Sequence, residues 1–340
     1  MVTIKDIARL SGYSIGTVSR VINHHPDVSE TARKKIEDVI ASLNFQPNSN
    51  AKMLKQSSMS SVTVLVKGMK NVFFESILEE MQKIIRDNGE DVSVLFLDEE
   101  ANEVETAVQL CAERRPKGLI FLGGNLNYFR QGFALITVPC VLTTVSAKEL
   151  GFENLSSFTT DDRSGARDAI EYLVNHGHRR IGILGGNPDE GRGQISSYRI
   201  SGALEVLGQK DLLFDLEKDY EPCRFSMEDG YEAAKRLVAK NQDLTAVFAI
   251  GDMIALGAVR GFADCGRRVP EDISVIGYDG IGYTRFAIPR ITTISQDVHR
   301  LAYRSVEDLL WRISYQRPAQ HGVIGHMIIP GESVIDYTGK

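Results

Sequence analysis

Apolar residues in the first 45 positions recur at the three- and four-residue spacing of amphipathic helices. This pattern predicts three helices. The first follows Thr3 and stops at the Ser11-Gly12 break, the second is Ile15–Ile22, and the third follows the capping residue Ser29. Because the first two helices are joined by a few residues that include a glycine, they predict a helix-turn-helix.

A different rhythm begins after residue 61. Short apolar runs such as Val62–Val66, Val92–Leu97 and Gly118–Leu122 alternate with amphipathic segments, and the same alternation restarts with Ile181–Leu184 and Ala246–Ile250. Strands that alternate with helices predict parallel sheets with right-handed crossovers, and about 280 residues predict two of them. Ligands of such folds bind beyond the carboxyl ends of the strands, and here between two lobes as well.

Composition places the chain among ordinary globular proteins, with 43% hydrophobic and 25% charged residues in 340. No apolar run approaches the roughly 20 residues that cross a bilayer, and the N-terminus lacks the pattern of a secretory signal. The four cysteines are far apart and form no CxxC pair. We therefore expect a cytoplasmic protein without a disulfide framework, structural zinc or other cofactor.

Charge is distributed unevenly. The whole chain carries a net charge of −6, but residues 1–57 hold eight Lys and Arg against five acidic residues, which leaves −9 on the remainder. A basic head on an acidic body favours an anionic polymer held at one end of the protein. A chance fluctuation over a short window gives the same numbers, so charge alone does not decide for DNA.

The second predicted helix carries the candidate chemistry for reading DNA. Arg20 on its outward face can donate two hydrogen bonds to a guanine, and Ile15 can contact a thymine methyl group. Gly16 offers no side chain, which favours either a close backbone approach or a position that reads little. Short donors suited to phosphate oxygens are Ser14, Thr17, Ser19 and Asn23. The alternative is a three-helix packing module that binds no DNA.

Three stretches, Thr3–Asn23, Val28–Arg33 and Leu43–Leu54, resemble the headpiece and hinge of the LacI/GalR family of bacterial transcription repressors. The resemblance implies that Ile15, Gly16 and Arg20 read bases in the major groove. It implies phosphate contacts from Thr3, Ser14, Thr17, Ser19, Asn23, Ser29 and Asn48.

The same resemblance implies a short hinge helix that contains Asn48, Ala51 and Leu54 and forms only on operator DNA. Its Leu54 would enter the minor groove as an apolar wedge that unstacks a base step. Two residues depart from the family pattern. Phe45 stands where Tyr is common, which removes a phosphate hydrogen bond, and Lys52 stands where Arg is common, which loses the planar fork.

Later stretches, among them Gly177–Leu184, Ala249–Gly257 and Val269–Asp279, resemble the effector domain of the same family. Effector residues implied by this resemblance are Arg199, Phe225 and Asp252, with Phe73, Phe74, Asn125 and Gln296 from the other lobe. Carboxylate and guanidinium groups beside an aromatic ring suit a polyol. Simpler roles stay open, because Asp252 can cap a helix, Arg199 can form an ion pair, and the paired phenylalanines can belong to the core.

The resemblance implies an α/β chain with an N-terminal three-helix DNA-binding head and hinge helix, followed by a two-lobed domain like that of periplasmic binding proteins. The expected boundaries are 1–45 for the head, 46–61 for the hinge and linker, and 62–340 for the effector-binding and dimerisation domain. Within the last, one lobe takes about 62–160 and 294–323, and the other takes about 161–293 and 324–340.

We therefore predict a homodimeric repressor of carbohydrate-metabolism genes that binds a near-palindromic operator under the control of a small-molecule effector, a sugar or sugar derivative. The body alone also fits an extracellular sugar-binding protein, although such a protein would have a signal peptide and no basic head. An enzyme is disfavoured, since the sequence has no GxGxxG, P-loop or GxSxG motif. The paired carboxylates Asp161-Asp162 are expected to cap a helix or lie at a lobe crossover.

Overall fold

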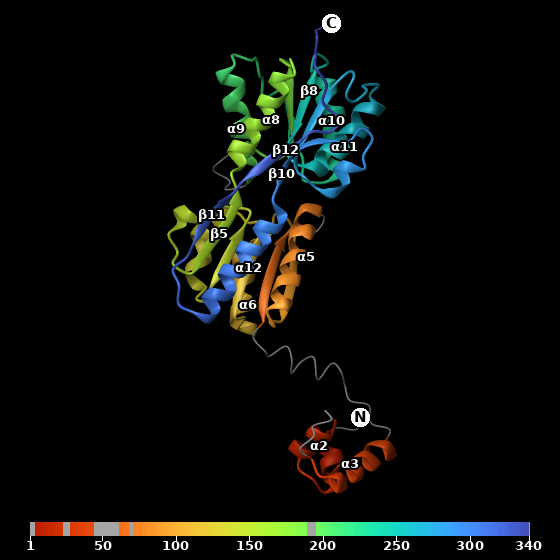
Figure 1. Cartoon of the computed structure of the whole chain (residues 1–340), viewed down its shortest axis with the longest axis vertical. Coiled ribbons are helices and arrows are strands. Elements are labelled where there is room, and N and C mark those ends of the chain that lie inside the picture. The colour runs from red at the N-terminus through yellow and green to blue at the C-terminus, as the bar shows by residue number, and fades with distance from the viewer. Residues whose placement is uncertain (1–3, 23–27, 44–60, 69–70, 189–194, 340) are drawn as a thin grey trace. The chain divides into compact units, whose positions relative to one another are not determined.

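The computed structural model describes residues 4–22, 28–43, 61–68, 71–188 and 195–339. They fall into two compact units, Met1–Met59 and Ser60–Lys340, which are described separately below (Figure 1). No helix in the described ranges is long and apolar enough to cross a membrane.

The first unit contains the three predicted helices, α1 (Ile4–Ser11), α2 (Ile15–Ile22) and α3 (Glu30–Ser42). Their apolar faces meet in a small core whose buried members are Ile7, Ala8, Val18, Val21 and Ile36. Gly12 has a φ of +76° between α1 and α2, a backbone conformation that favours glycine. The predicted helix-turn-helix is confirmed.

The first lobe of the second unit is built on a six-stranded parallel sheet with the order β11-β5-β4-β3-β1-β2. Its strands are β1 (Val62–Lys67), β2 (Val92–Leu97), β3 (Gly118–Leu122), β4 (Cys140–Thr143), β5 (Leu155–Thr160) and β11 (His321–Ile324). Its helices are α5 (Val72–Asp87), α6 (Glu103–Arg114), α7 (Leu126–Gly132) and α12 (Val298–Ser314), with short 3-10 turns η1 (Phe133–Leu135) and η2 (Lys148–Leu150). The sheet packs against these helices in two separate apolar clusters. One cluster includes residues of α5 and α12, and the other includes residues of α6 and α7.

The second lobe has a six-stranded sheet with the order β12-β10-β9-β8-β6-β7, in which only β12 is antiparallel among the described strands. Its strands are β6 (Ile181–Leu184), β7 (Tyr220–Glu221), β8 (Ala246–Ala249), β9 (Ser274–Asp279), β10 (Thr292–Gln296) and β12 (His326–Ile329). Its helices are α8 (Asp162–Asn175), α9 (Ile195–Gln209), α10 (Met227–Lys240) and α11 (Asp252–Asp264), with the 3-10 turn η4 (Gly282–Arg285). The predicted α/β architecture with two sheets is confirmed.

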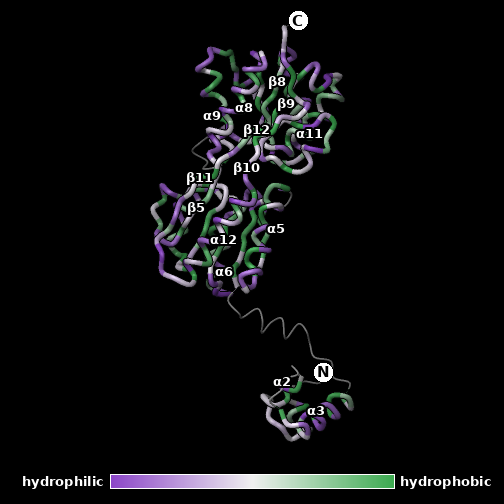
Figure 2. Tube along the Cα trace, in the orientation of Figure 1, coloured by the Kyte–Doolittle hydropathy of each residue, from purple (hydrophilic) through white to green (hydrophobic). Residues whose placement is uncertain are grey.

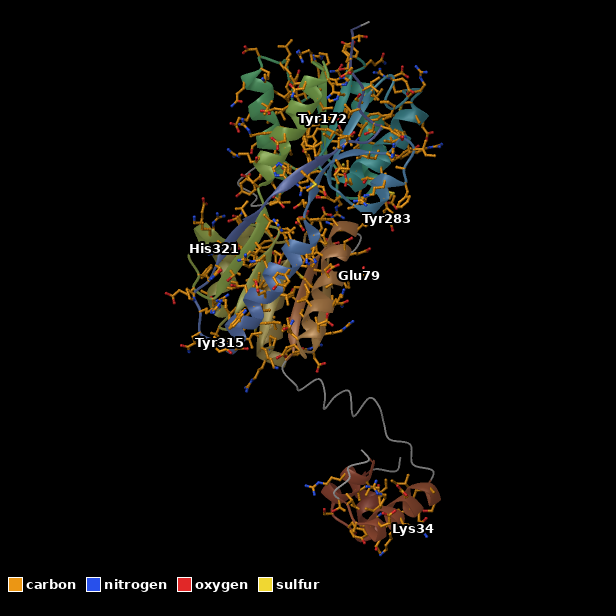
Figure 3. All side chains as sticks on the ribbon, in the orientation of Figure 1. Lys34, Glu79, Tyr172, Tyr283, Tyr315 and His321 are labelled. Carbon is orange, nitrogen blue, oxygen red and sulfur yellow. The ribbon has the colours of Figure 1, made fainter. Side chains whose placement is uncertain are left out.

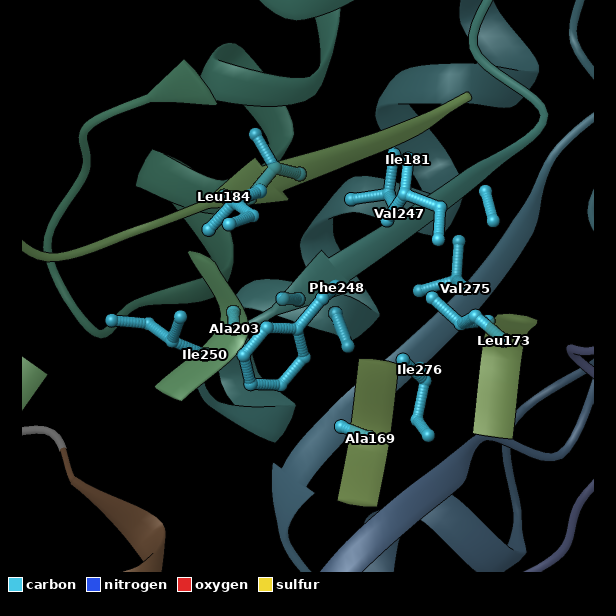
Figure 4. Packing of buried hydrophobic residues seen from close by; sticks show 14 of the residues in the cluster. Ala169, Leu173, Ile181, Leu184, Ala203, Val247, Phe248, Ile250, Val275 and Ile276 are labelled. Atoms are coloured by element: carbon cyan, nitrogen blue, oxygen red, sulfur yellow. The ribbon is translucent and has the colours of Figure 1, made fainter. Parts of the chain in front are cut away.

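Many of the strands in both sheets are apolar in sequence because they are buried in the fold. Apolar residues follow the strands of both sheets, while polar residues lie on the outer helix faces (Figure 2). In the second lobe, Phe248 and Ile276 of the sheet are fully buried together with Leu173 of α8 (Figure 4). Helices α10 and α11 approach so closely that a Cβ on Gly257 would lie 2.0 Å from the carbonyl oxygen of Met227. Only glycine fits there.

The chain passes between the two lobes three times. It leaves the first sheet after β5 and enters α8, returns between β10 and α12, and crosses again between β11 and β12. The expected boundary of about residue 294 lies close to the second of these crossings. It falls inside β10, which belongs to the second sheet because Thr292 through Ser295 pair with Ile276 through Asp279 of β9.

Candidate nucleic-acid interface and effector site

Helix α2 presents one polar face to solvent because its apolar face is used in the head's core. Val18 and Val21 are buried, whereas Gly16 and Arg20, four residues apart, are exposed. A Cβ placed on Gly16 would meet only the hydroxyl of Ser14, at 3.7 Å. No side chain projects from the helix at Gly16, and the long cationic side chain of Arg20 follows one turn later.

Two of the predicted phosphate contacts also cap helices. The Ser14 hydroxyl accepts the N–H of Thr17 at 3.1 Å and shares a second hydrogen bond of 2.9 Å with the Thr17 hydroxyl. Ser29 caps α3 by accepting the N–H of Ala32 at 3.4 Å. A capping hydroxyl accepts through its oxygen and can still donate its proton to a phosphate.

Other predicted DNA contacts cannot be located in the same way. Thr3, Asn23, Asn48, Ala51 and Leu54 lie outside the described residues. The backbones of Ile15 and Ser19 belong to α2, but their side chains are not described.

A buried charge cluster lies at the carboxyl end of the second sheet, centred on Arg199 of α9. Its Nε donates to Asp162 at 2.7 Å, and its Nη1 donates to the carbonyl of Ile250 at 2.6 Å and lies 3.1 Å from the carboxylate of Asp279. Burial disfavours the charged guanidinium and lowers its pKa. The negative charges of Asp279 and Asp162 have a larger, opposite effect, so the pKa of Arg199 lies above its usual value. The guanidinium is charged and held by two carboxylates.

Asp279, the last residue of β9, combines a strained backbone with a shifted carboxyl group. Its φ is +113°, which is rare for a residue other than glycine. Gln296 donates to its carboxylate at 2.8 Å. Burial raises the pKa of Asp279 to about 6 and the charge of Asp162 adds to this, against the opposing effects of Arg199 and Gln296.

An aromatic ring lies beside this carboxylate. A Cβ on Gly251 would be 2.9 Å from the ring of Phe225 and 3.5 Å from the Asp279 carboxylate, so ring and carboxylate face the same glycine. The predicted residues Arg199, Phe225 and Gln296 are thus gathered at one edge of the second sheet. The assignment of Gln296 to the first lobe was wrong, because Gln296 ends β10, which belongs to the second sheet. Together they offer cationic donors, anionic and amide acceptors, and an apolar face.

Asp252, which is also expected to contact an effector, is enclosed by hydrogen bonds within the protein. Its side chain is 0% exposed, and its carboxylate accepts the N–H groups of Gly280 at 2.7 Å and Ile281 at 2.9 Å and the hydroxyl of Thr293 at 2.6 Å. Burial, followed by the charge of Asp279, raises its pKa well above the usual value. It is not the helix cap either, because Gly251 occupies that position in α11.

The three candidates in the first lobe lie where β1 and β3 end, and they differ in availability. Phe73 is buried in the core, as the simpler reading allowed, whereas Phe74 is half-buried with its ring over Gly123. The Asn125 side chain caps α7 by accepting the N–H of Asn127 at 3.0 Å.

Asp162 and Asp279 were not among the effector residues expected from the sequence. Asp161 caps α8 by accepting the N–H of Ser164 at 2.9 Å, as predicted for one member of the pair, while Asp162 turns inward to Arg199. The sequence signal that could have identified Asp162 is the pair of consecutive acidic residues after a strand. A helix cap uses only one acidic side chain, so the second is left for another role. Asp279 was recognisable as a carboxylate at a strand end.

The shifted pKa of Asp279 gives a testable dependence of stability on pH. Because its folded pKa is raised from 3.8 to about 6, its favourable contribution to folding is complete below pH 4 and is lost as the pH rises through 6. The unfolding free energy of the wild type minus that of Asp279→Asn should therefore fall between pH 4 and 7, by about 3 kcal/mol at most. Urea unfolding at several pH values measures this.

Asp272→Asn is the matched control. The carboxylate of Asp272 is bound by Arg268, which lowers its pKa, so its contribution is lost only at more acidic pH. The corresponding difference should be flat between pH 4 and 7. A flat or rising difference for Asp279→Asn would show that burial does not dominate at that carboxyl group.

Comparison with known proteins places both units in one family. Residues 3–48 match the family described as bacterial regulatory proteins, lacI family, and residues 170–334 match the periplasmic binding protein-like domain. The HTH-type transcriptional regulator MalR of Clostridium butyricum is 35% identical over 335 residues, covering 97% of this chain and 98% of MalR. The repressor PurR of Pasteurella multocida is 31% identical over 320 residues, covering 92% of each.

Two solved structures align with 98% of this chain. The lac repressor dimer bound to operator and the anti-inducer ONPF aligns with a TM-score of 0.71 and 26% identity, covering 98% of this chain and 99% of the other. A complex of the transcriptional regulator CelR with cellobiose aligns with a TM-score of 0.68 and 25% identity, covering 98% of this chain and all of that one.

Proposed function

Because the chain belongs to the lacI family of bacterial regulatory proteins, we propose that it represses carbohydrate-metabolism genes and that a sugar or sugar derivative sets its affinity for operator DNA. The chain is a DNA-binding transcriptional regulator with an effector domain, and not an enzyme. We propose that it acts in the cytoplasm, because bacterial operator DNA lies there.

Recognition of DNA is assigned to the exposed face of α2. Arg20 reads a guanine, Ile15 contacts a thymine methyl group, and Gly16 allows the backbone to approach the groove. Phosphate contacts are assigned to Thr3, Ser14, Thr17, Ser19, Asn23, Ser29 and Asn48. The hinge residues Ala51 and Leu54 are assigned to the minor groove, with Leu54 as the wedge.

The observation that carries the effector assignment is the Arg199–Asp279 pair beside the Phe225 ring. Vicinal hydroxyl groups can accept from the guanidinium and donate to the carboxylate, while the C–H face of a sugar ring lies on the aromatic side chain. Gln296 contributes a further polar group. The contact expected of Asp252 passes to Asp279, because Asp252 is enclosed and bonded to other parts of the protein.

Phe74 and Asn125 are the proposed contributions of the first lobe, with Phe73 behind them in the core. Both lie at the end of the first sheet that corresponds to the Arg199 end of the second. Ligands of open parallel sheets bind at such ends. A ligand held from both lobes favours one arrangement of the lobes over another, which is the requirement for allosteric control.

We propose a homodimer, which requires a near-palindromic operator. Support comes from large apolar side chains on the second lobe that are exposed in the single chain. Tyr283, labelled in Figure 3, is 54% exposed, Phe286 is 85% exposed and Ile288 is 94% exposed. Neighbouring exposed apolar groups of this size mark interaction surfaces.

A thermal-shift screen tests the effector class. The panel contains sugars, sugar phosphates and nucleobases, and each hit is repeated with Asp279→Asn. We expect a sugar or sugar derivative to raise the melting temperature of the wild type, because binding to the native state alone stabilises it, and the variant to lose the response. A shift caused only by nucleobases would contradict the sugar assignment.

A further inference from the structure

We propose that Asp252 and Ile281 form a mechanical link that carries effector occupancy from the Arg199–Asp279 pair to the contact between the lobes. The inference rests on the proposed function, since it takes Asp279 as the effector contact. It makes Asp252 a positioning residue that acts through the segment following Asp279 and touches no ligand.

The link begins at the end of β9. Gly280 and Ile281 follow Asp279 directly, and both of their N–H groups donate to one oxygen of the Asp252 carboxylate, at 2.7 and 2.9 Å. Gly280 has a φ of +76°, and a Cβ there would lie 2.3 Å from the hydroxyl of Ser295. The turn after Asp279 is therefore fixed to α11 and pressed against β10, so it cannot move independently of them.

The second oxygen of Asp252 extends the link to the crossover. It accepts the hydroxyl of Thr293 at 2.6 Å, and Thr293 belongs to β10, the strand from which the chain returns to α12 of the first lobe. One buried carboxylate thus joins α11, the turn and the crossover strand. Removing the acceptor would leave three buried donors to find new partners.

The link ends inside the other lobe. Ile281 is 4% exposed, and its side chain belongs to the apolar cluster of the first lobe that contains Phe73 and Ile77. Met253 and Leu256 of α11 are packed against the same cluster. The residue two positions beyond the proposed effector carboxylate is therefore embedded in the opposite lobe.

A packed contact of this kind transmits displacement well. Interiors are close-packed, so a shift of Asp279 on binding a ligand is passed to Ile281 and changes the fit between the lobes. A second contact between the lobes is an ion pair of Arg224 with Glu99, at 3.9 Å and partly exposed. Exposed pairs at such distances contribute little, so the buried apolar contact is assigned the larger part of the coupling.

The test separates effector affinity from coupling. For the wild type, Ile281→Ala and Asp252→Asn, the affinity for the sugar found by thermal shift is measured by calorimetry, and operator affinity is measured with and without saturating sugar. Both variants should bind the sugar within about threefold of the wild type, while the effector-dependent change in operator affinity shrinks at least fivefold, from an initial range of about 5- to 150-fold.

Two controls keep the result specific. Ile181→Ala creates a comparable cavity at the opposite end of the second sheet, where the side chain is 1% exposed and makes no contact with the first lobe's cluster. Glu99→Gln removes the exposed ion pair. Both should retain the wild-type coupling. If Ile281→Ala does not fold, Ile281→Val replaces it, with a smaller loss of coupling expected.

Retained coupling in Ile281→Ala and Asp252→Asn would overturn the inference, as would an equal loss of coupling in Ile181→Ala, which would tie coupling to stability alone. Loss of sugar binding by Asp252→Asn would make Asp252 a ligand contact. Failure of the proposed function is distinguishable, because the wild type itself would then show no sugar binding or no effect of sugar on operator affinity.

Discussion

Replacing Arg199 with alanine should abolish effector binding and destabilise the effector unit by about 3–5 kcal/mol. Arg199 is the one cation that the structure shows paired with both Asp162 and Asp279, at 2.7 and 3.1 Å, and all three side chains are buried. Its removal leaves two carboxyl groups without their cation, and desolvation then pushes both toward the protonated form. Urea unfolding measures the loss of stability, and calorimetry measures the loss of binding.

Arg167→Ala is the matched control for this prediction. Arg167 also pairs with a carboxylate, Glu205, but both side chains are about a third exposed. Exposed pairs contribute about 0–1 kcal/mol, so this variant should be nearly as stable as the wild type and should bind effector normally. Similar losses of stability in the two variants would mean that burial does not strengthen the interactions of Arg199 with its carboxylates. If Arg199→Ala does not fold, Arg199→Lys should still lose binding, because an ammonium group lacks the fork that reaches two carboxylates.

Replacing Arg20 with alanine should weaken binding to the cognate operator by about 1–3 kcal/mol and relax the preference at one base pair in each half-site. The side chain is exposed on α2, on the opposite side from buried Val18 and Val21, and has the fork geometry that matches guanine. Binding-site selection followed by sequencing measures the preference, and anisotropy titration measures affinity.

A loss of one positive charge weakens any DNA complex, so the control must match the charge. Arg260→Ala removes an exposed arginine from α11 of the effector unit. It should leave operator specificity unchanged. Unchanged specificity in Arg20→Ala, with affinity lowered equally on all sequences, would reassign Arg20 to the phosphate backbone.

The helices of the head and several strands could be predicted closely because the information is local. Residues 15–22 form α2 as expected, with Val18 and Val21 inward, and Gly118–Leu122 and Ile181–Leu184 form β3 and β6 with the predicted bounds. In each case the apolar spacing and the flanking turn residues agree with burial in the fold.

The lobe to which a segment near a crossover belongs could not be predicted, because it depends on strand pairing with segments far away in the sequence. The assignment of β10 to the second sheet is decided by its register with β9, which no local pattern in residues 292–296 contains. Strands β11 and β12 were not predicted. They are four residues each, and Val323 and Met327 are exposed, so their apolar residues do not follow the alternation of a half-buried strand.

The effector residues named from the sequence stay predictions, and the structure adds the contacts that distinguish Asp252 from Asp279. Asp252 and Asp279 both follow or end a strand, and sequence could not tell which carboxylate stays available. The difference arises from the turn at Gly280 and Ile281, which folds back and donates both N–H groups to Asp252. The burial of Asp162 likewise depends on Arg199, which comes from another helix.

A sugar held at Arg199 and Asp279 should change how well the helix-turn-helix binds DNA. Anisotropy titration of a labelled near-palindromic fragment from the gene's own upstream region, with and without the sugar identified by thermal shift, tests it most directly. We expect specific binding whose affinity changes about 5- to 150-fold when the sugar saturates the protein. Equal operator affinity with and without bound sugar, or no binding to any such fragment at low salt, would contradict it.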